Sequence, residues 1–254
     1  MGKSFVSLEK AIQILSLFDA ENRELSAQEI SEKLSIPLST TYNYIKVFIA
    51  NKFLEKNEIT NKFCLGFNLF KLGILAAKNN SLIEITRPHL ISMAERSQET
   101  AVLTISDEMD VLCVDTIESP RLVKLTIKNG VRLPLHAGAP GKAVLAFKSR
   151  SFLHEMIQKR GLDKMNKNTI TNVEELEQEL ESIRTQGFST SNSEVDLGAG
   201  SLSVPIFDYN THVIASISLV GSAESIFREE KQEFIAMLKE TALKISAELG
   251  YIKG

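Results

Sequence analysis

The stretch Ser26–Gly66, SAQEISEKLSIPLSTTYNYIKVFIANKFLEKNEITNKFCLG, decides the fold of the first part of the chain. Its first four residues form a capping box, in which a serine oxygen and a glutamate three residues later satisfy free N–H groups at a helix start. We therefore expect a helix over residues 27–34. Pro37 follows a short turn and opens a second helical run, because the missing N–H of proline costs nothing near a helix start. Two helices joined by so short a turn predict a helix-turn-helix.

The flanks of this motif complete a winged helix-turn-helix. Two short strands are expected at residues 53–56 and 62–65, around a polar tip at residues 57–61. Upstream, the apolar residues of the segment 8–18 recur at helical spacing and predict a preceding helix. In a helix-turn-helix the second helix presents its N-terminal end to the base edges of DNA, so this part of the chain is the predicted DNA-binding domain.

The candidate DNA contacts lie in the second motif helix and in the wing. Hydroxyl and amide side chains bond phosphates or bases, an asparagine can contact adenine through two bonds, and lysines attract the phosphate backbone. The predicted DNA-binding residues are Ser39, Thr40, Thr41, Tyr42, Asn43, Lys46, Lys56 and Lys62. The alternative for the helix residues is the first turn of a solvated helix, and the alternative for any one lysine is an ordinary solvated surface. The complete winged helix favours DNA.

A helical segment at residues 67–80 follows the wing and is apolar on nearly its whole circumference. Its apolar residues are Phe67, Leu69, Phe70, Leu72, Ile74 and Leu75. A helix that is apolar all round must be buried on all sides. A connector between two domains achieves this by packing against another subunit, so we expect self-association here.

Residues 81–254 predict an α+β domain around one mainly antiparallel sheet. The segments TAVLTIS, DVLCVDTIE and RLVKLTIK read as strands, and GSLSVPIFD and HVIASISLVG read as a hairpin closed by YNT. Capping boxes in SLIE and TNVE predict helices over residues 82–98 and 173–186. A last helix is expected from about residue 225 to 249.

The bulk composition is that of a soluble cytoplasmic protein. The chain of 254 residues is 43% hydrophobic with a net charge of −3 and two cysteines outside any metal or disulfide spacing. No apolar run predicts a membrane span or an export signal. Residues 1–80 hold ten Lys and Arg against eight Asp and Glu, giving +2, and the remaining residues hold nineteen against twenty-four, giving −5. The N-terminal part is therefore the better partner for a polyanion, although +2 is a weak signal.

The stretch LHAGAPGKAVLAF at residues 135–147 resembles a phosphate-binding loop but lacks both ends of that motif. A Walker A loop needs a glycine five positions before its Gly-Lys pair and a Ser or Thr after the lysine. Here these positions hold His136 and Ala143. A GxSxG elbow and a zinc spacing of the histidines are also missing. We therefore expect no catalytic residue, no cofactor and no metal.

Three segments in this order resemble the IclR (isocitrate lyase regulator) family of bacterial transcription factors. They are IPLSTTYNYIKVFIANKFLEK, VRLPLHAGAPGKAVLAF and EVDLGAGSLSVPIFDYNTHVIASISLVGS, and the resemblance covers nearly the whole chain. It implies a DNA-binding domain at residues 1–66, a linker helix at 67–80 and a GAF-like effector-binding domain at 81–254. It also implies dimers that pair into tetramers. One departure is Asn43, where the resemblance predicts an arginine.

The resemblance also implies the positions that contact a small-molecule effector, such as an organic acid or an aromatic metabolite. Carried over residue by residue, they are Leu122, Ala139, Pro140, Ser191, Ser201 and Ser218. On the hairpin strands, Ser201 and Ser218 alternate with apolar residues, and hydroxyls in an apolar wall suit a small-molecule site. The alternative is that these hydroxyls satisfy backbone groups or face solvent. Val220 stands where a second serine is expected, which makes the site less polar.

Two other functions stay open on the residues alone. The first is an enzyme that transforms a small molecule, with the N-terminal part as a scaffold. The second is a sensor that binds protein partners through its apolar linker helix. The favoured function is a ligand-responsive regulator that binds double-stranded operator DNA with paired winged helices, as a repressor or an activator.

Overall fold

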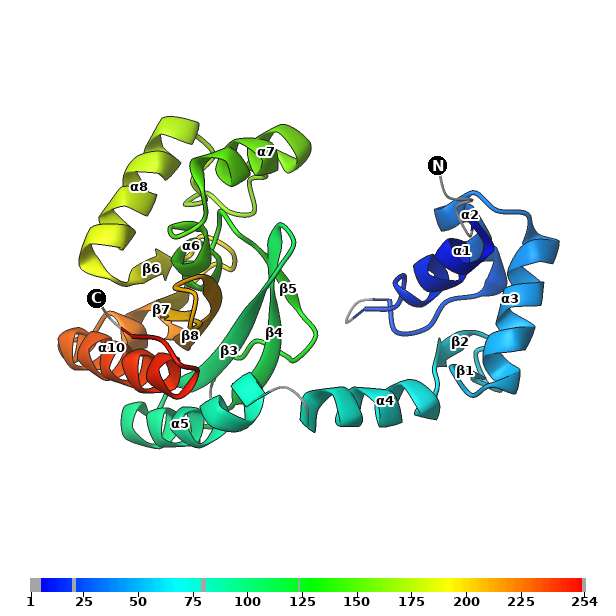
Figure 1. Ribbon diagram of the computed structural model, residues 1–254, viewed down its shortest axis with the longest axis horizontal. Helices are drawn as coiled ribbons and strands as arrows, with labels where there is room; N and C mark the ends of the chain where they lie inside the picture. Colours follow the sequence, from blue (N-terminus) through cyan, green and yellow to red (C-terminus); the bar gives the residue numbers. More distant parts are fainter. Residues whose placement is uncertain (1–5, 20–21, 79–80, 123, 253–254) are drawn as a thin grey trace. The chain divides into compact units, whose positions relative to one another are not determined.

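The computed structural model describes residues 6–19, 22–78, 81–122 and 124–252. The chain divides into two compact units, residues 1–80 and residues 81–254. Figure 1 shows an all-helical unit with one small hairpin and an α+β unit built on one sheet. Among the described residues, no helix is long and apolar enough to cross a membrane.

The N-terminal unit is a winged helix-turn-helix, as predicted. Its elements are α1 (Val6–Leu15), α2 (Ala27–Leu34), α3 (Leu38–Ala50), β1 (Leu54–Lys56), β2 (Phe63–Leu65) and α4 (Phe67–Lys78). The capping box of α2 is formed, because the Ser26 oxygen accepts from the Glu29 N–H and the Glu29 carboxylate accepts from the Ser26 N–H. The first helix is shorter than the expected segment 8–18 and ends at Leu15, yet Phe18 still packs into the core of this unit.

The start of α4 is fastened to the winged helix. The Phe67 N–H donates to the Glu55 carboxylate at 3.0 Å, and the Asn68 side chain donates to the carbonyl oxygen of Asn51 at 2.6 Å. Gly66 precedes these bonds, and a Cβ atom at this position would lie 2.5 Å from the carbonyl oxygen of Lys52. Only glycine allows this close approach, so the first turn of α4 is fixed to the end of α3 and to β1.

The C-terminal unit contains one antiparallel sheet with the strand order β5-β4-β3-β8-β7-β6. Its strands are β3 (Thr100–Asp107), β4 (Asp110–Ile117), β5 (Arg132–Pro134), β6 (Ser189–Asn192), β7 (Ala199–Phe207) and β8 (Val213–Ser222). Its helices are α5 (Ser81–Ser97), α6 (Ala139–Leu145), α7 (Arg150–Arg160), α8 (Val173–Gln186), α9 (Ala223–Ile226) and α10 (Lys231–Glu248). The long hairpin β7–β8 and the mainly antiparallel sheet follow the prediction.

Helices cover both faces of the sheet (Figure 1). Helices α5 and α10 pack on one face, where alternate apolar residues of β3, β7 and β8 form the main core. Helix α6 packs on the other face and is itself covered by α8, and a second apolar cluster lies among α6, α7 and α8. The face under α6 carries the polar residues of the same strands, because successive side chains of a strand point to opposite faces.

Three predicted elements of this unit differ in the structure. The described residues of the segment 121–128, which are 121, 122 and 124–128, form no strand. The carbonyl oxygens of Leu125 and Ile127 accept hydrogen bonds from threonine hydroxyls of the sheet instead. The cap of α8 is Asn172 and not the predicted Thr171, a shift of one residue. The expected last helix is two helices, and the turn between them carries Arg228 to a buried carboxylate.

Candidate functional site

The outer face of α3 presents a group of polar side chains at the N-terminal end of the helix. The exposed members are Ser39, Tyr42, Asn43 and Lys46, and Thr40 is half-buried. No other described group bonds to the side chain of Asn43 or Lys46. These residues are therefore free to donate to a nucleic acid, as an operator-reading helix requires.

Thr41 does not belong to this exposed group, which corrects its predicted role. Its side chain is fully buried, and its hydroxyl donates to the carbonyl oxygen of Pro37 at 3.3 Å. Thr41 and Ile45 are one helical turn apart, so they share the face of α3 that packs on the core. Sequence reasoning missed this because a threonine within a run of polar residues gives no apolar signal.

The two predicted lysines of the wing differ in their surroundings. Lys62 forms a partly exposed ion pair with Glu29 at 2.9 Å. The Ser26 backbone N–H and then the Lys62 ammonium lower the pKa of Glu29 to about 2. Lys56 is exposed and has no carboxylate partner among the described residues, and Lys52 at the end of α3 is in the same situation. Lys52 and Lys56 are therefore cations without a carboxylate partner among the described residues, whereas Lys62 has one.

The tip of the wing is held by one carboxylate from the segment before α2. Glu24 accepts from the Asn57 amide at 2.6 Å and from the Thr60 hydroxyl at 2.8 Å. These hydrogen bonds lower the pKa of Glu24. The Asn57 oxygen in turn accepts from the N–H of Ile59. The tip is thus a fixed turn, which gives the wing a defined shape against a partner.

The face of the sheet beneath α6 forms the second candidate site, which we name the serine face. It consists of hydroxyl side chains from five strands, Thr100, Thr104, Thr116, Ser189, Ser191, Ser201, Ser203, Ser216 and Ser218. The strand register sets them in rows, so that Ser201 lies opposite Ser191 on one side and opposite Val220 on the other. These residues come from distant parts of the chain and meet only in the folded sheet.

Most hydroxyls of the serine face are already engaged. Ser203 and Ser218 bond to each other at 2.7 Å, and so do Thr104 and Ser216. Ser216 also donates to the carbonyl oxygen of Pro140 at 3.1 Å. In the same way the Ser189 hydroxyl donates to the carbonyl oxygen of Ala139 at 2.6 Å. These two bonds attach the start of α6 to the sheet, so Ala139 and Pro140 meet the serine face through their backbone.

The six predicted effector positions are not all brought together. Ser191, Ser201 and Ser218 lie on the serine face, and Ala139 and Pro140 lie at the helix that covers it. The Leu122 side chain, in contrast, is fully exposed in the loop between β4 and β5. The structure therefore does not place Leu122 at the serine face.

The apolar neighbours of the serine face are not those that the hairpin pattern suggests. The apolar residues that alternate with Ser201 and Ser218, such as Leu202 and Leu219, point to the opposite face and pack under α5 and α10. The serine face instead carries a separate apolar cluster, whose members are Val102, Cys113, Val220 and, from the loop, Ile127. Burial raises the pKa of the Cys113 thiol, so it acts as a small apolar side chain.

A buried ion pair fixes the loop that leads into α6. The Lys142 ammonium, which is 1% exposed, binds Glu194 at 2.6 Å and Glu179 at 2.9 Å. The second oxygen of Glu194 accepts from the N–H of Gly138 at 3.1 Å. Lys142 and Glu194 are thus structural partners, and the imidazole of His136 is engaged by the carbonyl oxygen of Asp163. No spacing pattern in the sequence indicates the lysine–glutamate pair, because 52 residues separate its members.

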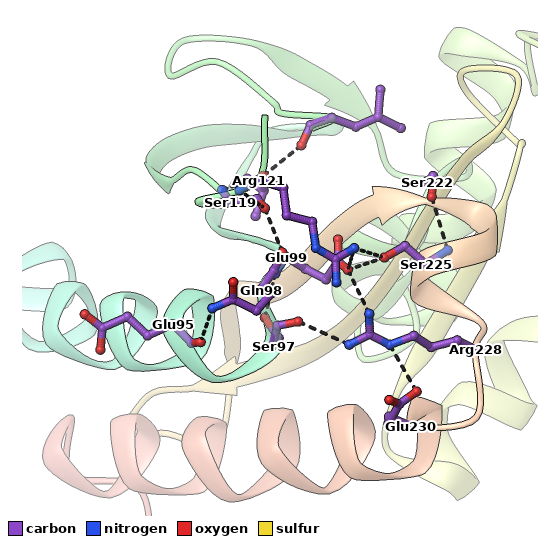
Figure 2. A network of polar contacts seen from close by, with 12 residues as sticks. Glu95, Ser97, Gln98, Glu99, Ser119, Arg121, Ser222, Ser225, Arg228 and Glu230 are labelled. Atoms are coloured by element: carbon purple, nitrogen blue, oxygen red, sulfur yellow. Dashed lines mark hydrogen bonds and ion pairs between the residues drawn. The ribbon is translucent and has the colours of Figure 1, made fainter. Parts of the chain in front are cut away.

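A second buried carboxylate, Glu99 directly before β3, anchors the first residues of the loop between β4 and β5. Figure 2 shows Glu99 at the centre of a polar network with Arg121, Ser225 and Arg228. Arg121 binds Glu99 at 3.0 Å and donates to the Ser225 hydroxyl at 2.8 Å. The Ser119 hydroxyl adds a bond to the carbonyl oxygen of Gln98 at 2.7 Å. This network fixes the first residues of the 118–131 loop, whose later residues contact the serine face through Ile127.

Neither site has the residues of a metal centre. Within the described ranges, no group of three or more His, Cys, Asp and Glu side chains is arranged to hold a metal ion. The chemistry that the two sites offer is hydrogen bonding and charge attraction, which suits binding.

Comparisons with known proteins agree with this arrangement. Residues 74–247 match the family described as bacterial transcriptional regulator IclR C-terminal, and residues 7–58 match the IclR helix-turn-helix domain. The HTH-type transcriptional regulator KdgR of Escherichia coli K12 is 28% identical over 247 residues, which span 96% of this chain and 94% of that protein.

Two solved structures extend the likeness. The IclR of Thermotoga maritima is 30% identical with a TM-score of 0.73, covering 97% of this chain and 99% of that chain. An IclR homolog from Microbacterium hydrocarbonoxydans, complexed with 4-hydroxybenzoate, shares the fold at 23% identity with a TM-score of 0.83, covering 96% and 98% of the two chains. These relatives are regulators, and nothing supports the enzyme alternative. The chain belongs to the IclR family of bacterial transcriptional regulators.

Proposed function

We propose that the exposed end of α3 reads a DNA operator and that the wing lysines attract its backbone. Ser39, Tyr42 and Asn43 face the base edges, and Lys46 meets a phosphate one helical turn further on. Lys52 and Lys56 add sequence-independent attraction. Thr41 is left out of this set because its side chain is buried in the core. Lys62 is left out because it forms an ion pair with Glu29. Since bacterial DNA lies in the cytoplasm, we place the protein there.

Self-association through α4 is part of the same proposal. Phe67, Phe70, Leu72 and Leu75 of this helix are each about half exposed or more within one chain. Leu8 and Ile12 of α1 are exposed to a similar degree. Water contact over this much apolar surface is unfavourable, and such patches mark protein interfaces. A two-fold dimer built on α4 sets two α3 helices against the half-sites of a roughly palindromic operator, and dimers can pair further into tetramers.

The serine face is the proposed effector site, for a small organic acid or an aromatic metabolite. Effector binding changes DNA affinity only when the effector binds the DNA-competent and DNA-incompetent arrangements with different affinity. Helix α4 is suited to carry the coupling, because its first turn is fastened to the winged helix through Glu55 and Asn68 and its last residue, Lys78, is close in sequence to the effector unit. A change in the packing of α4 therefore changes the spacing of two paired α3 helices.

Two observations carry the proposal: the free, exposed polar side chains at the N-terminal end of α3, and the exposed apolar residues of α4. Fluorescence anisotropy tests it, with the full-length protein and the DNA upstream of its own gene, titrated over salt and against scrambled DNA of equal length. We expect a salt-dependent preference for one upstream fragment and a dimer or tetramer in analytical ultracentrifugation. Equal affinity for scrambled DNA at every salt concentration contradicts the operator-reading role, and a monomer at the same protein concentration contradicts the role of α4.

A further inference from the structure

The outer edge of β7 is only partly covered by its neighbouring strand. Strand β6 pairs with residues 200–203, so residues 204–207 extend beyond it. Pro205 has no N–H group, and the Phe207 N–H donates to the Ser246 hydroxyl of α10 at 3.1 Å. Both features protect this part of the edge from pairing with another strand. Recognition of a molecule at this edge therefore depends on side chains.

A cavity of about 370 Å³ lies at the uncovered part of this edge. It is bounded by the end of α8, by β7 beyond its pairing with β6, and by the second half of α10. Figure 1 shows these two helices on opposite sides of β6 and β7. The volume of the cavity lies in the range of small-molecule sites.

One wall of the cavity is aromatic. The rings of Phe147 and Phe207 meet edge to face with centroids 5.1 Å apart, and the rings of Phe207 and Tyr251 stack with centroids 5.3 Å apart. Tyr251 reaches this position because Gly250, just after α10, adopts a φ of 87°, a left-handed conformation that favours glycine. The Tyr251 N–H then donates to the carbonyl oxygen of Ser246 at 2.8 Å. Such a wall favours contact with another flat ring.

The cavity is positively charged. Arg184 of α8 and Lys239 of α10 line it, and its described lining residues include no Asp or Glu. Arg184 pairs with Glu181 at 2.6 Å, whereas Lys239 is half-buried and has no carboxylate partner in the described part of the chain. The Lys239 ammonium lies 5.1 Å from the centre of the Phe188 ring. An ammonium in these surroundings attracts an anion, because a charge-assisted hydrogen bond to a carboxylate is among the stronger ones.

We propose that this cavity is a second ligand site, for a small aromatic monocarboxylate. The ring of the ligand packs against Phe207 and Tyr251, and its carboxylate pairs with Lys239. An aromatic cation would meet two like charges, and an uncharged ring would leave Lys239 without a counter-charge. The site is independent of the proposed effector role of the serine face and of DNA binding, because it shares no residue with either.

Four compounds test the ligand class: benzoate, benzamide, benzylammonium and cyclohexanecarboxylate. Full-length protein with fluorine-labelled tyrosine is titrated with each compound and followed by NMR. The chain has four tyrosines, and Tyr251→Phe identifies the signal of Tyr251. We expect benzoate to shift this signal. Benzamide and benzylammonium should bind at least about tenfold more weakly, because they cannot form the charge-assisted bond. Cyclohexanecarboxylate, which keeps the charge but lacks the aromatic face, should bind about threefold to tenfold more weakly.

Two variants assign the binding to the cavity, with affinities measured by ligand-detected NMR. Lys239→Met should weaken benzoate at least about tenfold and remove its advantage over benzamide. Tyr251→Leu should weaken benzoate about threefold to tenfold, the effect of one lost ring contact. Lys244→Met, which removes an exposed cation of the same helix outside the cavity, is the matched control and should change nothing. Thermal unfolding of each variant checks that the fold is kept.

Four results overturn the ligand site. Benzamide binding as tightly as benzoate would do so, as would benzoate binding that is unaffected by both Lys239→Met and Tyr251→Leu. An unchanged Tyr251 signal at millimolar benzoate also overturns it. If that signal instead changed with protein concentration in the absence of ligand, the cavity would belong to an interface between copies of the chain. DNA affinity, measured separately by anisotropy, tests the proposed function alone, so the two proposals can fail independently.

Discussion

The two units place their functional side chains in opposite environments. In the N-terminal unit, Asn43 and Lys46 are exposed on one helix, and their side chains have no partner among the residues that the structure describes. In the C-terminal unit, the hydroxyls of the serine face are buried and come from strands far apart, such as Thr104 and Ser216, which are 112 residues apart. A polyanion is recognised by donors that reach out from the surface, whereas a small molecule is recognised by groups that surround it.

The same contrast appears in the ion pairs of the two units. The side chains of Lys62 and Glu29 are 38% and 40% exposed, so water screens their attraction. The side chains of Lys142 and Glu194 are 1% and 9% exposed, so little water screens their attraction. In the first unit, a substitution at a side chain that contacts DNA should therefore change DNA binding with little effect on stability. In the second unit, a substitution at a buried polar side chain should change stability as well as function.

The largest effect is expected from Lys142→Met. Removing one member of a buried ion pair leaves uncompensated buried charge and costs about 3–5 kcal/mol. Differential scanning calorimetry should show the transition of residues 81–254 moved to lower temperature and the transition of residues 1–80 unchanged. Lys159→Met, which removes an exposed pair with Glu155, is the matched control and should leave both transitions in place. Equal shifts for the two variants would contradict the expected difference between a buried and an exposed ion pair.

The next effect is on DNA sequence preference and comes from Asn43→Ala. Loss of a bidentate contact to adenine reduces discrimination by about 1–3 kcal/mol, with no change in unfolding temperature because the side chain is exposed. Anisotropy against operator variants measures this. Thr41→Val, a change on the buried side of the same helix, should leave the DNA preference unaltered. If Thr41→Val changed the base preference and Asn43→Ala did not, the assignment of the two faces of α3 would be reversed.

A smaller effect is expected from Lys46→Ala. The lysine is assigned to a phosphate, so its removal should weaken binding to all sequences alike and reduce the slope of log K against log salt by about one. Titrations of operator and scrambled DNA at several salt concentrations give both slopes. A change in base preference with an unchanged slope would instead mean that Lys46 contacts a base.

The smallest effect is the pH dependence of the N-terminal unit. The Ser26 N–H and Lys62 lower the pKa of Glu29 from an ordinary 4.5 to about 2. The stabilisation is therefore present above pH 4.5 and is lost as the pH falls from 4.5 toward 2. In Glu29→Gln this part of the acid sensitivity should disappear, and thermal unfolding at several pH values measures it. If the unfolding temperature of Glu29→Gln depended on pH in the same way as that of the unchanged protein, the Glu29–Lys62 pair would have no role in acid stability.

The sequence predicted local structure better than it predicted the site. The capping box at Ser26 and the hairpin β7–β8 were confirmed because their signals lie within a few neighbouring residues. The strand expected at residues 121–128 was wrong, since alternation alone does not reveal whether a neighbouring strand is there to pair with. The predictions that Leu122 lies at the effector site and that the apolar residues of the hairpin line it were wrong for the same reason. Which face of the sheet a side chain points to, and how exposed it is, depend on segments that are distant in the chain.

The sequence by itself therefore determined the winged helix, the apolar character of α4, the α+β class and the family. Each of these follows from residue patterns within short segments or from the order of the segments. Only the tertiary structure decided that Thr41 belongs to the core, that Lys142 binds Glu194, and that Ser191 and Ser201 lie opposite each other beside Val220. The physical reason is that the first group depends on the helix period, caps and turns. The second group depends on burial and strand register, which are fixed only when segments distant in the chain pack together.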